Sequence, residues 1–215
     1  MSTEPVELAM FPLSSTVFPG QVVPLHVFED RYRTLLDELT ADGAEEGAFG
    51  KATFGIALID RGHEVGGDDH RVTTVGTRVE ILQAEEFEDG RWGVVVAGVE
   101  RINVHDWLKD DPYPRALVTA RTVADNGGGS LADVELLLIE AISLLTRQAG
   151  VEAPGPYAFD TDPHVHLDQL SALAPLNEFD RQKVLEAATT SEQIDTLHEA
   201  LSDKVTLLHA QLGEN

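Results

Sequence analysis

The sequence contains no cysteine, which excludes disulfides, thiolate metal sites and cysteine nucleophiles. It has no run of about 18 apolar residues anywhere. Its opening residues, MSTEPVELAM, lack the basic segment and apolar core of a signal peptide. From these absences we expect a cytoplasmic protein with no membrane partner.

Basic residues are scarce. The chain has 15 Lys and Arg against 38 Asp and Glu, a formal net charge of -23 at pH 7. Such a charge repels phosphate backbones and anionic lipids at long range, so we expect no nucleic-acid partner. The acidic residues are spread over the whole sequence, which is typical of a solvated surface.

The first 125 residues have the pattern of short strands separated by turns. Apolar segments predict strands at Val6–Phe11, Gln21–Phe28, Lys51–Ile59, Arg71–Ala84, Trp92–Val104 and Tyr113–Val123. Pro19-Gly20 predicts a type II turn, because Pro presets φ at the second turn position and Gly accepts a positive φ at the third. Asp89-Gly90 predicts a hairpin, and Gly98 predicts a bulge or sharp bend. Bent strands of this kind favour a small barrel or rolled sheet.

Helical periodicity follows Phe28, where a helix of about three turns is predicted to end near Asp42-Gly43, and it dominates the last part of the chain. The segment DNGGG at 125–129 predicts a boundary between a β-rich unit, residues 1–125, and a helical unit, residues 130–215. Helices are predicted at Ser130–Gln148, His166–Ala174, Asn177–Ala188 and from Thr190 onward. Ser130 with Asp133 and Thr190 with Gln193 are the predicted N-cap pairs.

The order of several short motifs is informative. FPL at 11–13, FPG at 18–20 and PLHVFEDRY at 24–32 follow one another closely, and DRQKVLE at 180–186 lies in a predicted helix. In this series the chain resembles the N-terminal, substrate-binding domain of the Lon protease family, over about Glu7 to Leu212. The resemblance implies an α+β fold, a PUA-like rolled β-barrel (pseudo-barrel) followed by a C-terminal α-helical bundle.

The chain departs from full-length Lon, in which an ATPase module and a protease domain with a Ser-Lys pair follow this unit. No stretch here resembles the phosphate-binding motif G-x-x-x-x-G-K-[ST]. Ser202 and Lys204 lie two residues apart on a predicted helix and so do not share a face. We therefore expect a stand-alone, non-enzymatic module without a cofactor, which binds unfolded or partly folded polypeptides and presents them to a protease or chaperone.

Large apolar residues of the opening segment are the candidate binding residues. Phe18, Val22 and Tyr32 are candidates for a groove that takes extended or unfolded polypeptide through apolar burial and strand-edge pairing. The competing interpretation places them in the barrel core.

A second hypothesis rests on the polar cluster at 160–168. Asp162, His164 and His166 could hold a divalent cation, because His-x-His on an extended segment points both rings the same way. This alternative predicts a metal-dependent small-molecule enzyme. The competing interpretation is an acidic loop that leads into a helix starting near Asp162 or Pro163, and no third, distant ligand is evident. Nucleic-acid binding, which PUA-like barrels elsewhere show, is opposed by the negative charge.

Overall fold

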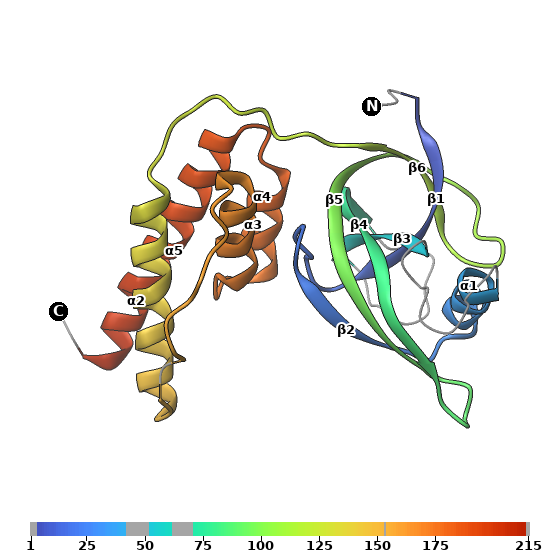
Figure 1. Cartoon of the computed structure of the whole chain (residues 1–215), viewed down its shortest axis with the longest axis horizontal. Helices are drawn as coiled ribbons and strands as arrows, with labels where there is room; N and C mark the ends of the chain where they lie inside the picture. Colours follow the sequence, from blue (N-terminus) through green and yellow to red (C-terminus); the bar gives the residue numbers. More distant parts are fainter. Residues whose placement is uncertain (1–3, 42–51, 62–70, 153, 214–215) are drawn as a thin grey trace. The chain divides into compact units, whose positions relative to one another are not determined.

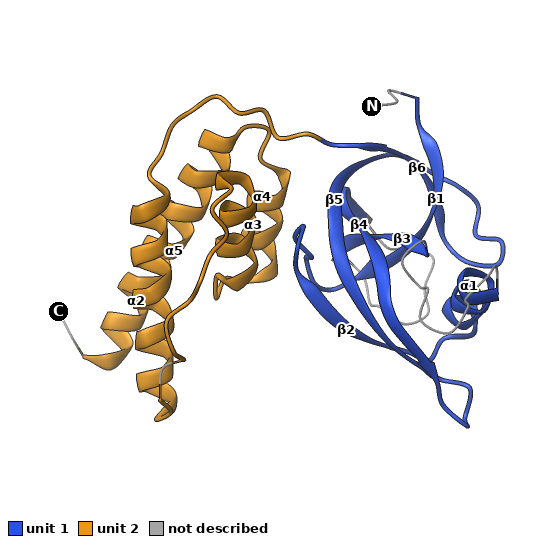
Figure 2. Cartoon of the chain, in the orientation of Figure 1, with its two compact units in different colours: residues 1–121 blue, residues 122–215 orange. Residues whose placement is uncertain are grey.

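The computed structural model describes residues 4–41, 52–61, 71–152 and 154–213. It divides into two compact units, residues 1–121 and residues 122–215 (Figure 2). The helix end predicted at Asp42-Gly43 and the strand start predicted at Lys51 lie outside the described residues. The α+β class and the succession of a rolled sheet and a helical bundle are confirmed.

In its described residues, the first unit is a rolled sheet of six strands with one helix (Figure 1). Its elements are β1 (Val6–Leu13), β2 (Val22–Val27), α1 (Asp30–Ala41), β3 (Thr53–Arg61), β4 (Arg71–Glu86), β5 (Trp92–Trp107) and β6 (Arg115–Ala120). The strand order is β2-β5-β4-β3-β1-β6, and β6 also pairs with β5, which closes a ring. Only the pair of β1 and β3 is parallel among the described ladders.

Strand β5 makes this closure possible because it is long. Its first part, residues 92–97, pairs with β2, and its last part, residues 102–107, pairs with β6. Strand β2 therefore extends the sheet beside the closed ring and forms its edge.

Two glycines shape the start of β2: Gly20 lies in the turn before it, and Gly98 lies in β5 where that turn approaches it. The amide of Gln21 donates to the carbonyl of Phe18 at 3.1 Å, and Gly20 has φ 76°, which confirms the type II turn at Pro19-Gly20. At Gly98 a Cβ would lie 2.1 Å from the carbonyl oxygen of Phe18. The register of β4 and β5 shifts beside Gly98, so the predicted bend there is confirmed.

A second bulge and a tight turn shape strands β4 and β5 at their connection. The turn closes with the amide of Gly90 donating to the carbonyl of Phe87 at 2.8 Å, which confirms the predicted hairpin. Within β4 the register shifts between Ile81 and Gln83. The extra residue, Leu82, is 47% exposed.

Apolar side chains fill the inside of the rolled sheet. The larger group of buried residues combines strand residues with Tyr32, Leu35 and Leu36 of α1. A smaller group comprises Met10, Ala57, Ile102, Val104, Ala116 and Val118. One face of helix α1 therefore completes the core of the sheet, as its amphipathic sequence requires.

The described part of the second unit contains four helices. They are α2 (Leu131–Ala149), α3 (Pro163–Leu173), α4 (Glu178–Glu186) and α5 (Thr190–Leu212). The predicted N-cap at Ser130 is confirmed, since its side chain accepts from the amide of Asp133. The predicted cap at Thr190 is wrong by one residue, because Thr189 accepts from the amide of Glu192.

Two predicted boundaries also change. Helix α3 begins at Pro163 and not at His166, because the side chain of Asp162 caps it and Pro suits the first helical position. Strand β6 ends at Ala120, whereas the sequence predicted a strand to Val123. Beyond it, Ala124 forms a bridge with Thr189, and both residues belong to the second unit. No helix within the described residues is long and apolar enough to cross a membrane.

Candidate functional site

Two of the three predicted binding residues belong to the core. Phe18 is fully buried and Tyr32 is 3% exposed. The ring of Tyr32 stacks on Phe11 with 4.1 Å between centroids, and burial raises the pKa of Tyr32 to about 12. Neither side chain is on the surface, because the turn and the first residues of α1 direct both of them inward. The competing interpretation of these two residues therefore describes their position correctly.

Val22, the third candidate, lies on the surface with 56% exposure. It starts β2, in which burial alternates so that Val22, Pro24 and His26 point outward while Leu25 and Val27 point inward. One side of β2 therefore belongs to the core and the other to the surface.

Strand pairing continues the outward side of β2 across β5 and β4. Residues that pair directly across a ladder share a face. Three such rows run from β2 through β5 to β4: Val22–Ala97–Glu80, Pro24–Val95–Gln83 and His26–Gly93–Glu85. The bulged Leu82 adds an exposed side chain beside the middle row. We call the surface formed by Val22, Pro24, His26, Leu82, Val95 and Ala97 the β2–β5 outer face.

A hollow continues this surface at the end near the hairpin. A Cβ on Gly93 would lie 3.1 Å from Cζ of Phe87, so the Phe87 ring covers Gly93 beside His26. Phe28, 55% exposed, and Phe87, 40% exposed, both line a cavity of about 190 Å³. His26 lines the same cavity and joins it to the β2–β5 outer face.

The backbone edge of β2 is less suited to binding than its side-chain face. Within the described residues, β2 pairs only with β5. The amide of Gly98 donates to the carbonyl of Gln21 at 2.9 Å. By the alternation of an antiparallel ladder, the backbone N–H and C=O groups at positions 22, 24 and 26 then point away from β5, toward the free edge of the sheet. Pro24 has no N–H, so a strand added at this edge would lose a hydrogen bond in its centre.

A larger hollow, of about 380 Å³, lies elsewhere on the first unit. Its apolar wall includes Ile102 and Val118, which are core residues with 1% and 2% exposure. Nε of Arg78 bonds Oε1 of Glu100 at 2.9 Å on another wall. Of the lining residues, Val6 is a large exposed apolar side chain, at 56%. The volume is greater, but Val6 is the one large exposed apolar side chain among its described lining residues, whereas the β2–β5 outer face has Val22 and Leu82.

The three candidate metal ligands make separate contacts. Nε2 of His164 lies 3.9 Å from Oδ2 of Asp125, and Nε2 of His166 lies 3.5 Å from Oε2 of Glu135. Asp162 caps α3 through its own carboxylate. The segment is helical and not extended, so residues two apart point to different sides. Within the described residues, no group of three His, Asp or Glu side chains could hold a metal ion.

Most residues of the β2–β5 outer face were missed by the sequence analysis. Leu82 interrupts the alternation of its strand, which was a weak signal for a bulge. Pro24 within an apolar strand was a signal for an edge strand. Phe87 beside a predicted hairpin turn carried no signal for a binding surface, because its position over Gly93 depends on the fold.

The comparisons with known proteins agree with this fold. The family model of the ATP-dependent protease La (LON) substrate-binding domain matches residues 7–203. The chain belongs to the Lon substrate-binding domain family. The resemblance of the sequence motifs is thereby confirmed, and the matched family is a substrate-binding domain and not a catalytic one.

Relatives of this Lon domain are longer proteins. It is 26% identical over 214 residues to Lon protease 2 of Herpetosiphon aurantiacus, covering 96% of this chain and 25% of the relative. It is 24% identical over 214 residues to the Lon protease of Anaeromyxobacter dehalogenans, covering 95% of this chain and 24% of the relative. The chain thus spans about a quarter of the length of these relatives.

Two solved structures share the fold. The crystal structure of a Lon N-terminal domain protein from Xanthomonas campestris has a TM-score of 0.58 and 21% identity, covering 89% of this chain and 96% of that one. The N-terminal domain of a Mycobacterium avium complex Lon protease has a TM-score of 0.59 and 22% identity, covering 92% and 99%. At this level of identity the similarity describes the fold.

Proposed function

We propose that this Lon domain is a non-catalytic module that binds unfolded or partly folded polypeptides on the β2–β5 outer face. The observation that carries the proposal is the pair of exposed large apolar side chains on the β2–β5 outer face, Val22 at 56% and Leu82 at 47% exposure. Membership of a substrate-binding domain family supports the same function.

The physical basis of binding is burial of apolar surface on both partners. Covering a side chain as exposed as Val22 contributes about 1 kcal/mol, since full burial of a valine is worth roughly 1.5–3 kcal/mol. The hollow between Phe28 and Phe87 offers a deeper position for one large apolar side chain. Because a flexible polypeptide must be ordered on binding, the net affinity is weak.

This surface favours unfolded over folded polypeptides. In an extended segment every second side chain points to the same side, which matches the spacing of Val22, Pro24 and His26. A folded protein keeps such apolar side chains in its own core. Contact through side chains also avoids the β2 edge that Pro24 interrupts.

The proposed role is recruitment. The module holds a polypeptide weakly and presents it to a protease or chaperone. We place this activity in the cytoplasm, where a chain without cysteine loses nothing in a reducing environment.

The test is a fluorescence-anisotropy titration of this protein against a labelled, permanently unfolded polypeptide and its folded counterpart. We expect saturable binding to the unfolded form alone. The variant Val22→Ser should weaken binding about fivefold, which corresponds to about 1 kcal/mol.

A matched control is present in the chain. Val6 has the same 56% exposure as Val22 and lies in β1, away from the β2–β5 outer face. The variant Val6→Ser should bind like the wild type. Equal loss in both variants, or no binding by the wild type, would show that the β2–β5 outer face is not the docking surface.

A further inference from the structure

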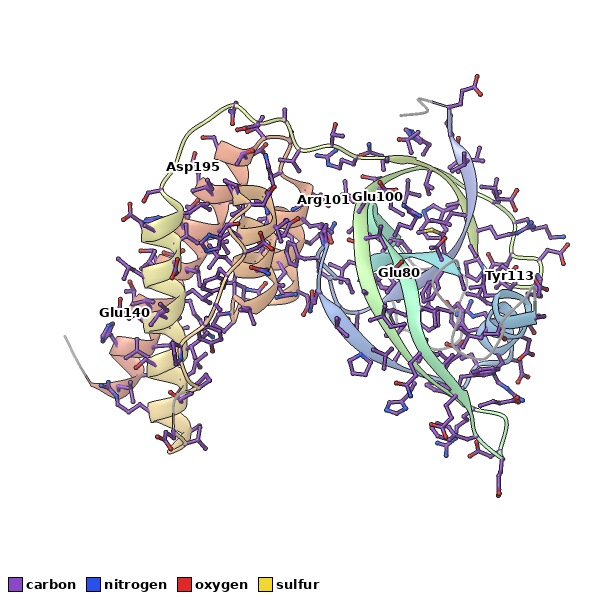
Figure 3. The ribbon with its side chains drawn as sticks, in the orientation of Figure 1. Glu80, Glu100, Arg101, Tyr113, Glu140 and Asp195 are labelled. Atoms are coloured by element: carbon purple, nitrogen blue, oxygen red, sulfur yellow. The ribbon has the colours of Figure 1, made fainter. Side chains whose placement is uncertain are left out.

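The β2–β5 outer face is apolar in its centre and acidic along β4. Glu80 ends the row that begins at Val22, and Glu85 ends the row that begins at His26. Glu80 is half-buried and Glu85 is exposed. Figure 3 labels Glu80, which belongs to strand β4. The two carboxylates therefore stand at opposite ends of one border of the face, with Leu82 between them.

These two charges are not compensated within the described residues. Neither Glu80 nor Glu85 has an ion-pair partner there. Arg78, two residues before Glu80 on the same side of β4, is already bonded to Glu100 at 2.9 Å.

Arg91 lines the hollow at the other end of the face. Its guanidinium is bonded to Asp89 at 2.7 Å. Arg78 and Arg91 are thus already paired. With a chain charge of -23, the whole protein also attracts cationic segments and repels acidic ones.

The spacing of the two carboxylates has a counterpart in an extended segment. The rows of Glu80 and Glu85 begin four residues apart on β2, which is about 13 Å at about 3.3 Å per residue. In an extended chain, residues i, i+2 and i+4 point to the same side, and i and i+4 are also about 13 Å apart. Residue i+2 then faces the middle row of Pro24, Val95 and Gln83, with the exposed Leu82 beside it.

On the basis of the proposed function, we infer a substrate class for this face. We propose that it selects extended polypeptide segments with two basic residues four positions apart and an apolar residue midway between them. The apolar residue is buried on the centre of the face while the two basic side chains reach Glu80 and Glu85.

The test uses three labelled peptides of equal length that lack stable structure. The first has lysines at i and i+4 around a leucine at i+2. The second has the same composition with the lysines adjacent, so that they point to opposite sides. The third replaces both lysines of the first by glutamate. Each is titrated by anisotropy against the full chain, at about 50 mM and about 200 mM salt, because screening weakens exposed ion pairs.

We expect the spaced-lysine peptide to bind about three- to tenfold tighter than the adjacent-lysine peptide, as two partly exposed ion pairs allow. The glutamate peptide should bind more weakly than both, and the preference should shrink at the higher salt. The double variant Glu80→Gln, Glu85→Gln should remove the preference.

The control variant is Glu86→Gln, Glu88→Gln. It changes the net charge by the same amount, but Glu86 follows Glu85 and points to the other side of β4, and Glu88 lies in the turn. This variant should retain the preference. Thermal midpoints of both double variants establish that each is folded.

Equal affinity for the spaced and adjacent peptides, or equal effects of the two double variants, would overturn the inference and leave the proposed function intact if the unfolded polypeptide still binds. If neither the peptides nor the unfolded polypeptide bind, both the inference and the proposed function fail.

Discussion

The two units place their elements by interactions of different range. In residues 122–215 the helices start at side chains that accept from amides three residues ahead, as at Ser130 and Thr189. In residues 1–121 distant residues are joined, as where Oγ1 of Thr77 donates to the carbonyl of Val17 at 2.6 Å. A local change in a helix start should therefore have a small effect, whereas a change at a crossing of the rolled sheet should displace the β2–β5 outer face.

The largest effect on stability is expected where the Pro19-Gly20 turn approaches β5. A Cβ on Gly98 would meet the backbone oxygen of Phe18 at 2.1 Å, so Gly98→Ala forces the turn away from β5. We expect a loss of about 3–4 kcal/mol in the free energy of unfolding. Urea unfolding followed by tryptophan fluorescence measures it, because Trp92 and Trp107 both lie in β5.

Gly155 provides the control for this substitution. No atom lies within 4 Å of a Cβ added there, so Gly155→Ala should change the unfolding free energy little. An unchanged unfolding midpoint for Gly98→Ala would contradict the close approach of the turn and β5.

A core substitution in the second unit sharpens the comparison. Leu138 in α2 is fully buried, and Leu138→Ala should cost about 3 kcal/mol. Leu136 in the same helix is 66% exposed, so Leu136→Ala should cost little. Far-ultraviolet circular dichroism follows the helices while tryptophan fluorescence follows the sheet. If the two units unfold separately, Leu138→Ala shifts the transition followed by circular dichroism more than the transition followed by tryptophan fluorescence. Equal shifts would mean that the units unfold as one.

Alkaline pH should destabilise the first unit through Tyr32. Burial raises the pKa of Tyr32 from 10.0 to about 12, so between these values the unfolded tyrosine is ionised while the folded one keeps its proton. The folded state then binds more protons, and its stability falls as the pH rises, by about 2–3 kcal/mol.

Comparison with Tyr32→Phe isolates this effect. The pKa of Tyr113 is also raised to about 12, by burial and by its hydrogen bond to Glu38, but Tyr113 is present in both proteins. Urea midpoints at several pH values should fall less steeply in the variant. Parallel curves would contradict the burial of the Tyr32 hydroxyl.

The smallest effect is expected at a helix cap. Ser130→Ala removes the acceptor for the amide of Asp133 and should cost about 1 kcal/mol. Ser130→Asn keeps a capping side chain and should cost much less. Thermal unfolding followed by circular dichroism compares the two, and equal stability of the Ala and Asn variants would show that the cap contributes nothing.

The local features of the fold were predictable from the sequence. Pro19-Gly20, Asp89-Gly90 and Ser130 act within three or four residues, so their turns and cap follow from residue type. The cap at Thr189 was misplaced because two threonines stand side by side and either could have accepted.

The candidate site was predictable only in part. Val22 was named, but Phe18 and Tyr32 turned out to be buried, because apolar character alone does not tell the two sides of a strand or helix apart. The rows that join Val22 to Glu80 depend on pairing between strands far apart in the sequence and on the bulge at Leu82. A shift of one residue in that register would exchange the inner and outer sides.

Site-specific photo-crosslinking tests the location of the docking surface most directly. Because the chain has no cysteine, Val22→Cys creates a single attachment point for a photoreactive group, and Val6→Cys creates a second one of equal 56% exposure in the wild type. With a labelled unfolded polypeptide, we expect covalent capture from position 22 and much less from position 6. Equal capture from both positions, or stronger capture from position 6, would contradict docking on the β2–β5 outer face.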